Sequence, residues 1–495
     1  MNPLKKLAGQ TAIYGLSSIV GRLLNYLLVP LHTRVFAPEQ FGVVTEMYSY
    51  VAFLLVLLTY GFETAYFRFS QKEKSDTLFG TSMISMLVTS FIFFIGCTVF
   101  AQPISNLIDY PNHAHYVVWF AAILAADAIT AIPFARLRQE NKAFRFAFIK
   151  LVNIGVNIIL NVFWLWFCPW YLSSHPEGNA LLNWIYEPEM GVGYVFLANL
   201  LASVITLLML LPNIFKIKLR FDLTLWKSLF RYSFPLMIGG LAGITNEMFS
   251  RVSMKYQLPA GEAMHELGIF GACYKVAILM TIFIQTFRFA AEPFFFNQAK
   301  DSNAKQLYAE VMNYFVAACS LIYLGIMLFI PVVRLFIDQA YYEGLAVVPI
   351  LLMANIFLGI FFNLSIWFKL NDKTSIGAWL SIGGALLTIL LNYLWIPTYS
   401  YIGASWATFV CYFSMMAVSY VLGQKYFPIP YQKFKIIAYP LGAWLISCLV
   451  DFLPDWPNWS SVVLRSLLLI AFLGIIFWIE WREKMANFTP NKKSI

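Results

Sequence analysis

The chain has 495 residues, of which 60% are hydrophobic and 12% charged, and its formal net charge is +9. This much apolar surface exceeds what the core of a water-soluble protein of this length can bury, so a soluble globular class is excluded. The positive charge does not indicate a nucleic-acid partner, because the basic residues are distributed over separate loops. The composition therefore predicts a membrane protein that binds no nucleic acid.

Apolar stretches of about 20 residues, long enough to cross a hydrocarbon layer of about 30 Å as a helix, recur along the whole chain. We expect an all-α membrane protein of about fourteen transmembrane helices. Two lysines in the opening MNPLKKLAGQ precede an apolar stretch without a small-residue cleavage site, which favours a retained first span over a signal peptide. The predicted spans lie near 10–30, 42–66, 78–101, 116–135, 146–168, 191–211, 232–252, 267–296, 308–330, 345–368, 375–396, 402–423, 436–450 and 460–480.

Lysine and arginine concentrate in alternate loops, and the opposite loops hold only Arg34, Lys255 and Arg334. Because positive residues favour cytoplasmic loops, this asymmetry predicts that both termini are cytoplasmic and that the number of spans is even.

A faint internal repeat relates the first six spans to the next six. We therefore expect an N-terminal lobe at 1–212, a C-terminal lobe at 213–424, and two additional spans with a cytoplasmic tail at 425–495. Both lobes start on the same side, which predicts parallel repeats about an axis along the membrane normal. The matched pairs are Asn25 with Asn246, Pro38 with Pro259, Gly42 with Gly268, and Tyr48 with Tyr274.

The segment RFDLTLWKSLFRYSFP, Arg220 to Pro235, joins the two predicted lobes. Leu223, Trp226 and Phe230 share one helical face, as in a helix that lies on a membrane surface. This segment is either a short interfacial helix or the entry to span seven.

The sequence contains none of the motifs GxxxxGK[ST], HExxH or GxSxG. Its six cysteines occur singly, without a spacing such as CxxC, and are expected to be free apolar thiols. We therefore predict no catalytic residues, no metal, no cofactor and no enzymatic activity.

Charged residues inside spans are the candidate functional residues, because each costs at least about 2.5 kcal/mol at mid-membrane unless it faces protein or water. Most lie in spans one, two, seven and eight, which the repeat makes equivalent, so we expect them to line a central cleft. Basic side chains there suit an anionic group such as phosphate. The substrate-binding candidates are Arg22, Arg251, Lys275 and Arg288; the candidates for coupling to a proton or sodium ion are Glu46, Glu63, Asp127, Glu247 and Glu292.

Simpler roles compete with these assignments. Glu247 with Arg251, and Arg288 with Glu292, are spaced i to i+4 and could neutralise one another on one helix. Asp127 and Glu46 could equally serve in hydrogen bonds between helices. Three asparagines of span five lie four residues apart, and we expect them to bond to neighbouring helices: Asn153, Asn157 and Asn161.

Four segments resemble the polysaccharide-biosynthesis flippases, the Wzx-type branch of the multidrug/oligosaccharidyl-lipid/polysaccharide (MOP) exporter superfamily. They are EQFGVVTEMYSYV from Glu39, GFETAYFRFS from Gly61, YSFPLMIGGL from Tyr232 and LGIFGACYKVAILM from Leu267. The resemblance extends to about residue 425. It departs at Glu247 and Arg251, where many relatives have adjacent Asp and Arg.

This resemblance implies two six-helix lobes with two further helices. It also implies translocation of an undecaprenyl-pyrophosphate-linked oligosaccharide across the bacterial cytoplasmic membrane by alternating access, for surface polysaccharide biosynthesis. The pyrophosphate would enter a cationic cavity while the lipid tail stays in the bilayer. The implied partners are this substrate, membrane lipids and other polysaccharide assembly proteins.

Three other functions compete with this one. A flippase for the peptidoglycan lipid precursor would differ in its head group. A cation-coupled drug or metabolite exporter would have a more acidic cleft and typically twelve spans. A membrane-embedded glycan polymerase or ligase would need a substantial external loop with catalytic residues, whereas the longest one here, from about Pro169 to Met190, contains no lysine or arginine.

Overall fold

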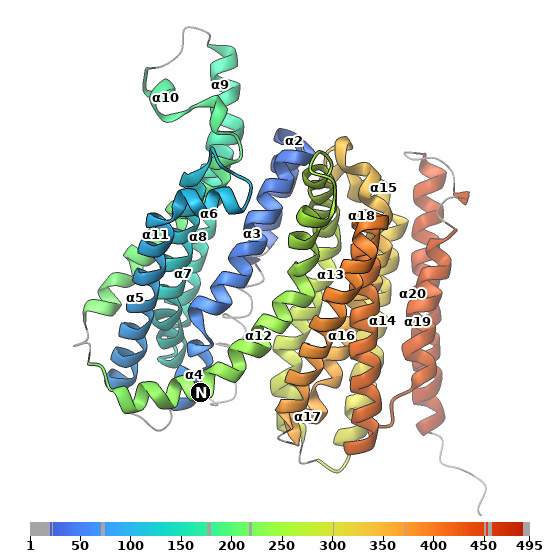
Figure 1. Ribbon diagram of the computed structural model, residues 1–495. Coiled ribbons are helices and arrows are strands. Elements are labelled where there is room, and N and C mark those ends of the chain that lie inside the picture. The colour runs from blue at the N-terminus through green and yellow to red at the C-terminus, as the bar shows by residue number, and fades with distance from the viewer. Residues whose placement is uncertain are drawn as a thin grey trace, which may run out of the picture. The chain divides into compact units, whose positions relative to one another are not determined.

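The computed structural model describes residues 20–21, 23–70, 75–175, 180–216, 220–299, 301–371, 373–449, 452–453 and 458–488. Within these ranges the chain forms helices and no β-strand, as Figure 1 shows. Ten of the helices are long and apolar enough to cross a membrane, judged by length and composition. The prediction of an all-α, multi-pass membrane protein is confirmed.

Four of the fourteen predicted spans have no separate counterpart among these ten helices. Most of the stretch 10–30 lies outside the described residues. Helix α12 (Leu223–Gln257) carries several charged side chains and does not meet the apolarity requirement. Helix α19 (Lys433–Ser447) has 15 residues. Helix α18 (Thr374–Tyr426) contains two predicted spans in 53 residues, and the non-helical Ser400 interrupts it with φ 47° and ψ −133°.

The described chain packs into two compact units. The first unit is formed by described residues of Met1–Ala272 together with Ala385–Tyr401, and the second by those of Cys273–Gly384 together with Ile402–Ile495. These units reflect packing alone, so the lobe boundaries at residues 212 and 424 stay a prediction.

The first unit contains the helices up to α12 and the first turns of α13. Figure 1 shows α5, α7, α8 and α11 running side by side, and α7 packs against both α5 and α11. The helices are α2 (Val29–Val35), α3 (Pro38–Thr59), α4 (Phe62–Phe69), α5 (Ser75–Val99), α6 (Ala101–Leu107), α7 (Ala114–Gln139), α8 (Ala143–Val162), α9 (Cys168–Ser174), α10 (Ala180–Ile185), α11 (Gly193–Phe215), α12 and α13 (Ala263–Gln298).

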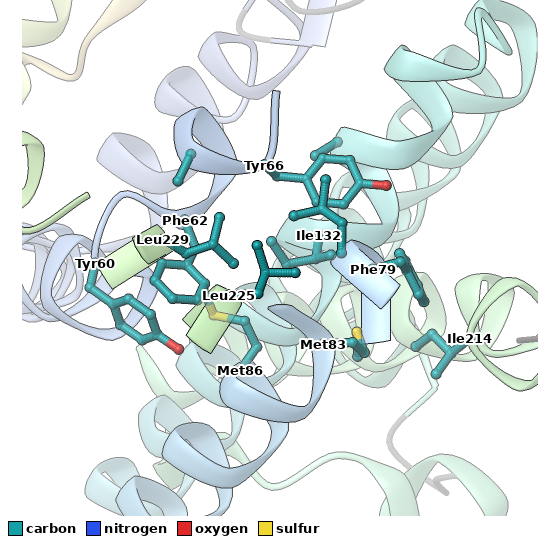
Figure 2. Packing of buried hydrophobic residues seen from close by; sticks show 13 residues of the cluster. Tyr60, Phe62, Tyr66, Phe79, Met83, Met86, Ile132, Ile214, Leu225 and Leu229 are labelled. Carbon is teal, nitrogen blue, oxygen red and sulfur yellow. The ribbon is translucent and has the colours of Figure 1, made fainter. Parts of the chain in front are cut away.

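An apolar core joins the start of α12 to α4, α5 and α7 (Figure 2). Leu229 is fully buried in it, and Trp226 donates its indole N–H to the Ser85 hydroxyl at 2.8 Å. The Asp222 side chain caps the helix by accepting from the Leu225 amide at 3.0 Å. Because α12 then continues to Gln257, Leu223 to Pro235 is the first part of one long helix and forms no separate helix.

The second unit contains the rest of α13 and the helices that follow, except the Ala385–Tyr401 part of α18, which belongs to the first unit. Within it, α14 packs against α16, α19 and α20. The helices are α14 (Ala304–Leu328), α15 (Ile330–Val333), α16 (Val348–Leu364), α17 (Ile366–Leu370), α18, α19 and α20 (Trp459–Phe488).

Ionic contacts fasten α20 to the second unit near both of its ends. The buried Lys435 of α19 pairs with Glu480 and with Glu483, each at 2.7 Å. The buried Arg465 donates to the backbone carbonyl of Leu328, at the end of α14, at 2.6 Å. Such charges are stable in a membrane helix only with partners, so α20 is an integral part of this unit.

Helix α3 and the first turns of α13 touch backbone to backbone. A Cβ atom at Gly268 would lie 1.8 Å from the Pro38 carbonyl oxygen, and one at Gly42 would lie 2.1 Å from the Met264 carbonyl oxygen. Only glycine permits this approach. Gly42 and Gly268 are also a matched pair of the predicted internal repeat.

Replacing Gly268 by Ala should destabilise the protein by about 1–3 kcal/mol, because the added methyl group meets backbone that cannot move aside. The melting temperature of the detergent-purified protein measures this effect. Gly243→Ala is the matched control, since Gly243 lies in α12 with nothing within 4 Å of its Cβ position and alanine favours a helix. Equal melting temperatures for the two variants would contradict the prediction.

Candidate functional site

The first unit buries a carboxylate, Glu46, among hydrogen-bond donors. Glu46 has no exposed surface, and its Oε1 lies 2.9 Å from the Lys255 ammonium nitrogen. Tyr50 donates to Oε1 at 2.6 Å and Tyr110 donates to Oε2 at 2.5 Å. Lys255 also donates to the backbone carbonyl of Ile108. We call Glu46, Tyr50, Tyr110 and Lys255 the Glu46 cluster.

The Glu46 cluster ties together α3, α12 and the segment that follows α6. The positive charge of Lys255 lies 4.3 Å above the Tyr110 ring, and its side chain is 7% exposed. Burial and then the charge of Glu46 raise the pKa of the Tyr110 hydroxyl, so Tyr110 stays a donor. With one cation and one anion, the cluster is neutral and its described groups satisfy one another.

Glu46 was a candidate from the sequence, whereas Lys255 was predicted to lie in an external loop and Tyr110 was missed. One signal for Lys255 was available, because it is one of few basic residues in the loops that are poor in lysine and arginine. No sequence pattern connects either residue to Glu46, because 64 positions separate Tyr110 from it.

Lys255→Met should destabilise the protein by about 3–5 kcal/mol, because it leaves the buried Glu46 carboxylate without its counter-ion. Glu46→Gln should act in the same direction by leaving the Lys255 charge unpaired. The double variant should recover much of the loss, since it removes both charges, and melting temperatures of the four proteins form the cycle that tests this. A double variant that loses the sum of both single effects would show that the two side chains are not coupled.

Glu63 lies in α4 and forms an ion pair with Arg138 near the end of α7. Both side chains are partly exposed, 45% and 30% respectively. Arg138 also lies over the Phe67 ring at 4.9 Å. Glu63 is therefore matched by a local cation in this structure.

Asp127 lies in α7 and accepts a hydrogen bond from the Ser203 hydroxyl of α11 at 2.9 Å. Within the described ranges, no basic side chain lies within ion-pair distance of its carboxylate. Polar contacts continue nearby, since Asn153 of α8 donates to Thr206 of α11 at 2.9 Å. Asp127 therefore differs from Glu46 and Glu63, which each pair directly with a cation.

Two of the three asparagines of α8 form the predicted hydrogen bonds to neighbouring helices. Asn153 reaches α11, and Asn161 bonds to His32 of α2 at 2.9 Å. Asn161 also donates to the Asn157 side chain at 3.1 Å. This stripe therefore holds helices together at these contacts.

Arg251 lies in α12 and is 6% exposed. Its guanidinium donates to the backbone carbonyl of Glu247 at 3.1 Å and contacts the Met248 sulfur, and it lies 6.0 Å from the Phe270 ring centre. The contact between Glu247 and Arg251 therefore passes through the main chain, while the Glu247 side chain is exposed. Arg22, another cationic candidate, lies outside the described residues.

The second unit contains an ionic cluster in which two cations share one carboxylate. Glu292 Oε1 lies 3.3 Å from Arg288 Nε and also contacts the Lys369 ammonium group. We call Arg288, Glu292 and Lys369 the Glu292 cluster. It carries a net positive charge, and its side chains are 27–49% exposed. Lys275, also on α13, is half-buried.

A buried asparagine lines the small cavity at the Glu292 cluster. Asn363 is 4% exposed, and in the part of the chain that the structure describes neither its Oδ1 nor its Nδ2 has a hydrogen-bond partner. Arg288, Glu292 and Lys369 line the same cavity. Unpartnered amide groups beside an excess cation provide donors for an anionic oxygen.

The i to i+4 contact of Arg288 and Glu292 was one alternative from the sequence, and this contact is present. Lys369 was missed, because it follows the end of predicted span ten and was not counted as a charge within a span. Its position directly after that apolar stretch was the only local signal.

The model of the family described as "Polysaccharide biosynthesis protein" matches residues 7–298, more than half of the chain. A comparison with curated proteins gave no match. The family match confirms the resemblance seen in the sequence.

Solved structures show the same fold at low sequence identity. An inward-facing multidrug resistance MATE family transporter of the MOP superfamily is 15% identical, with a TM-score of 0.65, covering 82% of this chain and 94% of that one. The Lipid II flippase MurJ in an inward closed conformation is 13% identical, with a TM-score of 0.69, covering 95% of this chain and 99% of that one. At such identities the likeness is one of architecture.

Proposed function

Because the chain belongs to the polysaccharide biosynthesis protein family, we propose that it is a flippase for an undecaprenyl-pyrophosphate-linked oligosaccharide. It moves this substrate across the bacterial cytoplasmic membrane by alternating access, for surface polysaccharide biosynthesis, and it is a transporter without catalytic activity. Its termini lie in the cytoplasm. The Glu292 cluster supports this proposal best, because it provides an excess of positive charge within membrane helices.

In the proposed mechanism, Glu292 is an exchangeable counter-ion. Without substrate it neutralises part of the charge of Arg288 and Lys369, which lowers the cost of holding cations in a membrane protein. A pyrophosphate group then takes over these contacts, since guanidinium and ammonium groups bind phosphate oxygens well. When the substrate leaves, Glu292 pairs with the cations again.

Other predicted residues complete this proposal. Arg22, Arg251 and Lys275 remain proposed substrate-binding residues. The lipid tail remains in the bilayer while the oligosaccharide crosses. Other polysaccharide assembly proteins are the expected partners that supply and use the substrate.

Arg288→Ala and Lys369→Ala should each reduce surface glycan export about tenfold or more, because a hydrogen bond to a charged group contributes about 1.5–3 kcal/mol and 1.4 kcal/mol corresponds to a factor of ten. Export is measured as surface polysaccharide in a strain that depends on this chain, and immunoblots of the membrane fraction establish equal protein levels. Lys425→Ala is the control, since Lys425 is exposed and its ammonium group lies near the ring of the neighbouring Tyr426. Normal export in both cluster variants would overturn the role of this cluster.

We propose Asp127 as the group that carries a coupling proton. Glu46 and Glu63 are paired with cations, whereas Asp127 accepts from a hydroxyl group. Glu247 and Glu292 remain as further candidates for coupling to a proton or sodium ion.

Asp127→Asn should abolish the part of substrate transport that depends on a pH gradient, because an amide cannot take up and release a proton. Transport in proteoliposomes with and without an imposed gradient measures this dependence. Glu63→Gln is the control and should retain the gradient dependence. A gradient response that is unchanged in Asp127→Asn would contradict the assignment.

A flippase for the peptidoglycan lipid precursor is the second candidate function, favoured by the architectural likeness to the Lipid II flippase. Complementation separates the two functions. Rescue of a conditional strain that lacks Lipid II flipping, without any effect on surface polysaccharide, would favour this second function. Drug resistance on overexpression would favour a cation-coupled exporter.

A further inference from the structure

Three helices of the second unit, α16, α18 and α19, surround an apolar groove of about 750 Å³. The part of α19 that lines it carries Ile437, Leu441 and Trp444, spaced so that they share one helical face. These side chains are 44–64% exposed, so the groove is open along this face. Volumes of this size accommodate a ligand with substantial apolar surface.

The opposite walls of the groove are equally apolar. Phe357 of α16 and Phe413 of α18 line it, and their rings are 5.2 Å apart. Met353 and Trp406 extend these walls. Because the described residues along these walls include no charged side chain, the middle of the groove suits hydrocarbon and no polar ligand.

Among the described residues that line the groove, only Lys433 is charged, and it lies in the first turn of α19. Lys433 is exposed, and its ammonium group lies 5.7 Å from the Tyr420 ring centre. In the described ranges, no acidic side chain lies within ion-pair distance of it. Lys435, two positions on, points to the other side of α19 and is already paired with Glu480 and Glu483.

The polar end and the apolar walls have the proportions of one lipid in one leaflet. From Lys433 to Trp444 the helix rises about 16 Å, close to half of a hydrocarbon layer of about 30 Å. Basic residues beside grooves between membrane helices attract anionic head groups. The charge of Lys433 and the length of the groove along α19 therefore both indicate an anionic lipid.

We propose that this groove binds one anionic phospholipid of the surrounding bilayer, with its acyl chains along α16, α18 and α19 and its phosphate group on Lys433. The lipid is a resident component of the second unit and covers the open face of the groove. This proposal does not depend on the proposed flippase function, because the ligand is a bilayer lipid and remains bound.

Native mass spectrometry of the full-length protein, released from nanodiscs with equal amounts of phosphatidylglycerol and phosphatidylcholine, tests this site. We expect one retained phosphatidylglycerol in preference to phosphatidylcholine. Lys433→Ala should reduce this retention about fivefold, because one basic residue near a lipid surface contributes about that factor. Lys425→Ala, which removes a charge outside the groove lining, should retain the lipid.

A second variant tests the groove independently of the charge. Ala417→Trp fills the space between the walls and should reduce retention with Lys433 intact, while a monodisperse gel-filtration profile shows that the protein is folded. Equal retention of both lipids, or unchanged retention in Lys433→Ala, would overturn the proposal. Displacement of phosphatidylglycerol by an equimolar polyprenyl phosphate would also overturn it, by assigning the groove to another lipid class.

Discussion

The backbones of α3 and α13 are in direct contact, and this contact constrains the packing of the first unit. Gly42 and Gly268 leave no room for a side chain between the two helices. Met264, whose carbonyl group touches Gly42, also places its sulfur 3.8 Å from the Tyr110 hydroxyl, which in turn donates to Glu46. The contact at Gly42 and Gly268 and the Glu46 cluster are therefore parts of one packed region. A substitution in either should alter the packing of the other.

Two ionic clusters in the same protein have opposite chemical character. The Glu46 cluster is buried, neutral and satisfied by its own tyrosines, so its charges stabilise helix packing. The Glu292 cluster is partly exposed and has two cations for one carboxylate. Only the second has charge available for a ligand, which is why we assign the anionic head group to it.

Helix α19 performs two tasks with two faces. Lys435 faces the glutamates of α20 and fastens that helix to the unit, whereas Lys433 stands at the end of the apolar groove. Residues that are two positions apart in a helix, such as Lys433 and Lys435, point to nearly opposite sides. The same residue type therefore serves protein packing at one position and is proposed to serve lipid binding at the other.

The sequence by itself determined the all-α membrane class and the family, because these follow from composition and motifs. Spacing within one helix offered the Arg288–Glu292 contact as one alternative, which the structure contains. Only the tertiary structure decided that Lys255 pairs with Glu46 and that Lys369 shares Glu292. The physical reason is that helical periodicity fixes which residues share a face of one helix, whereas the partner across a helix interface depends on how the helices pack. Glu46 and Lys255 meet because α12 packs against α3, which no pattern within either helix predicts.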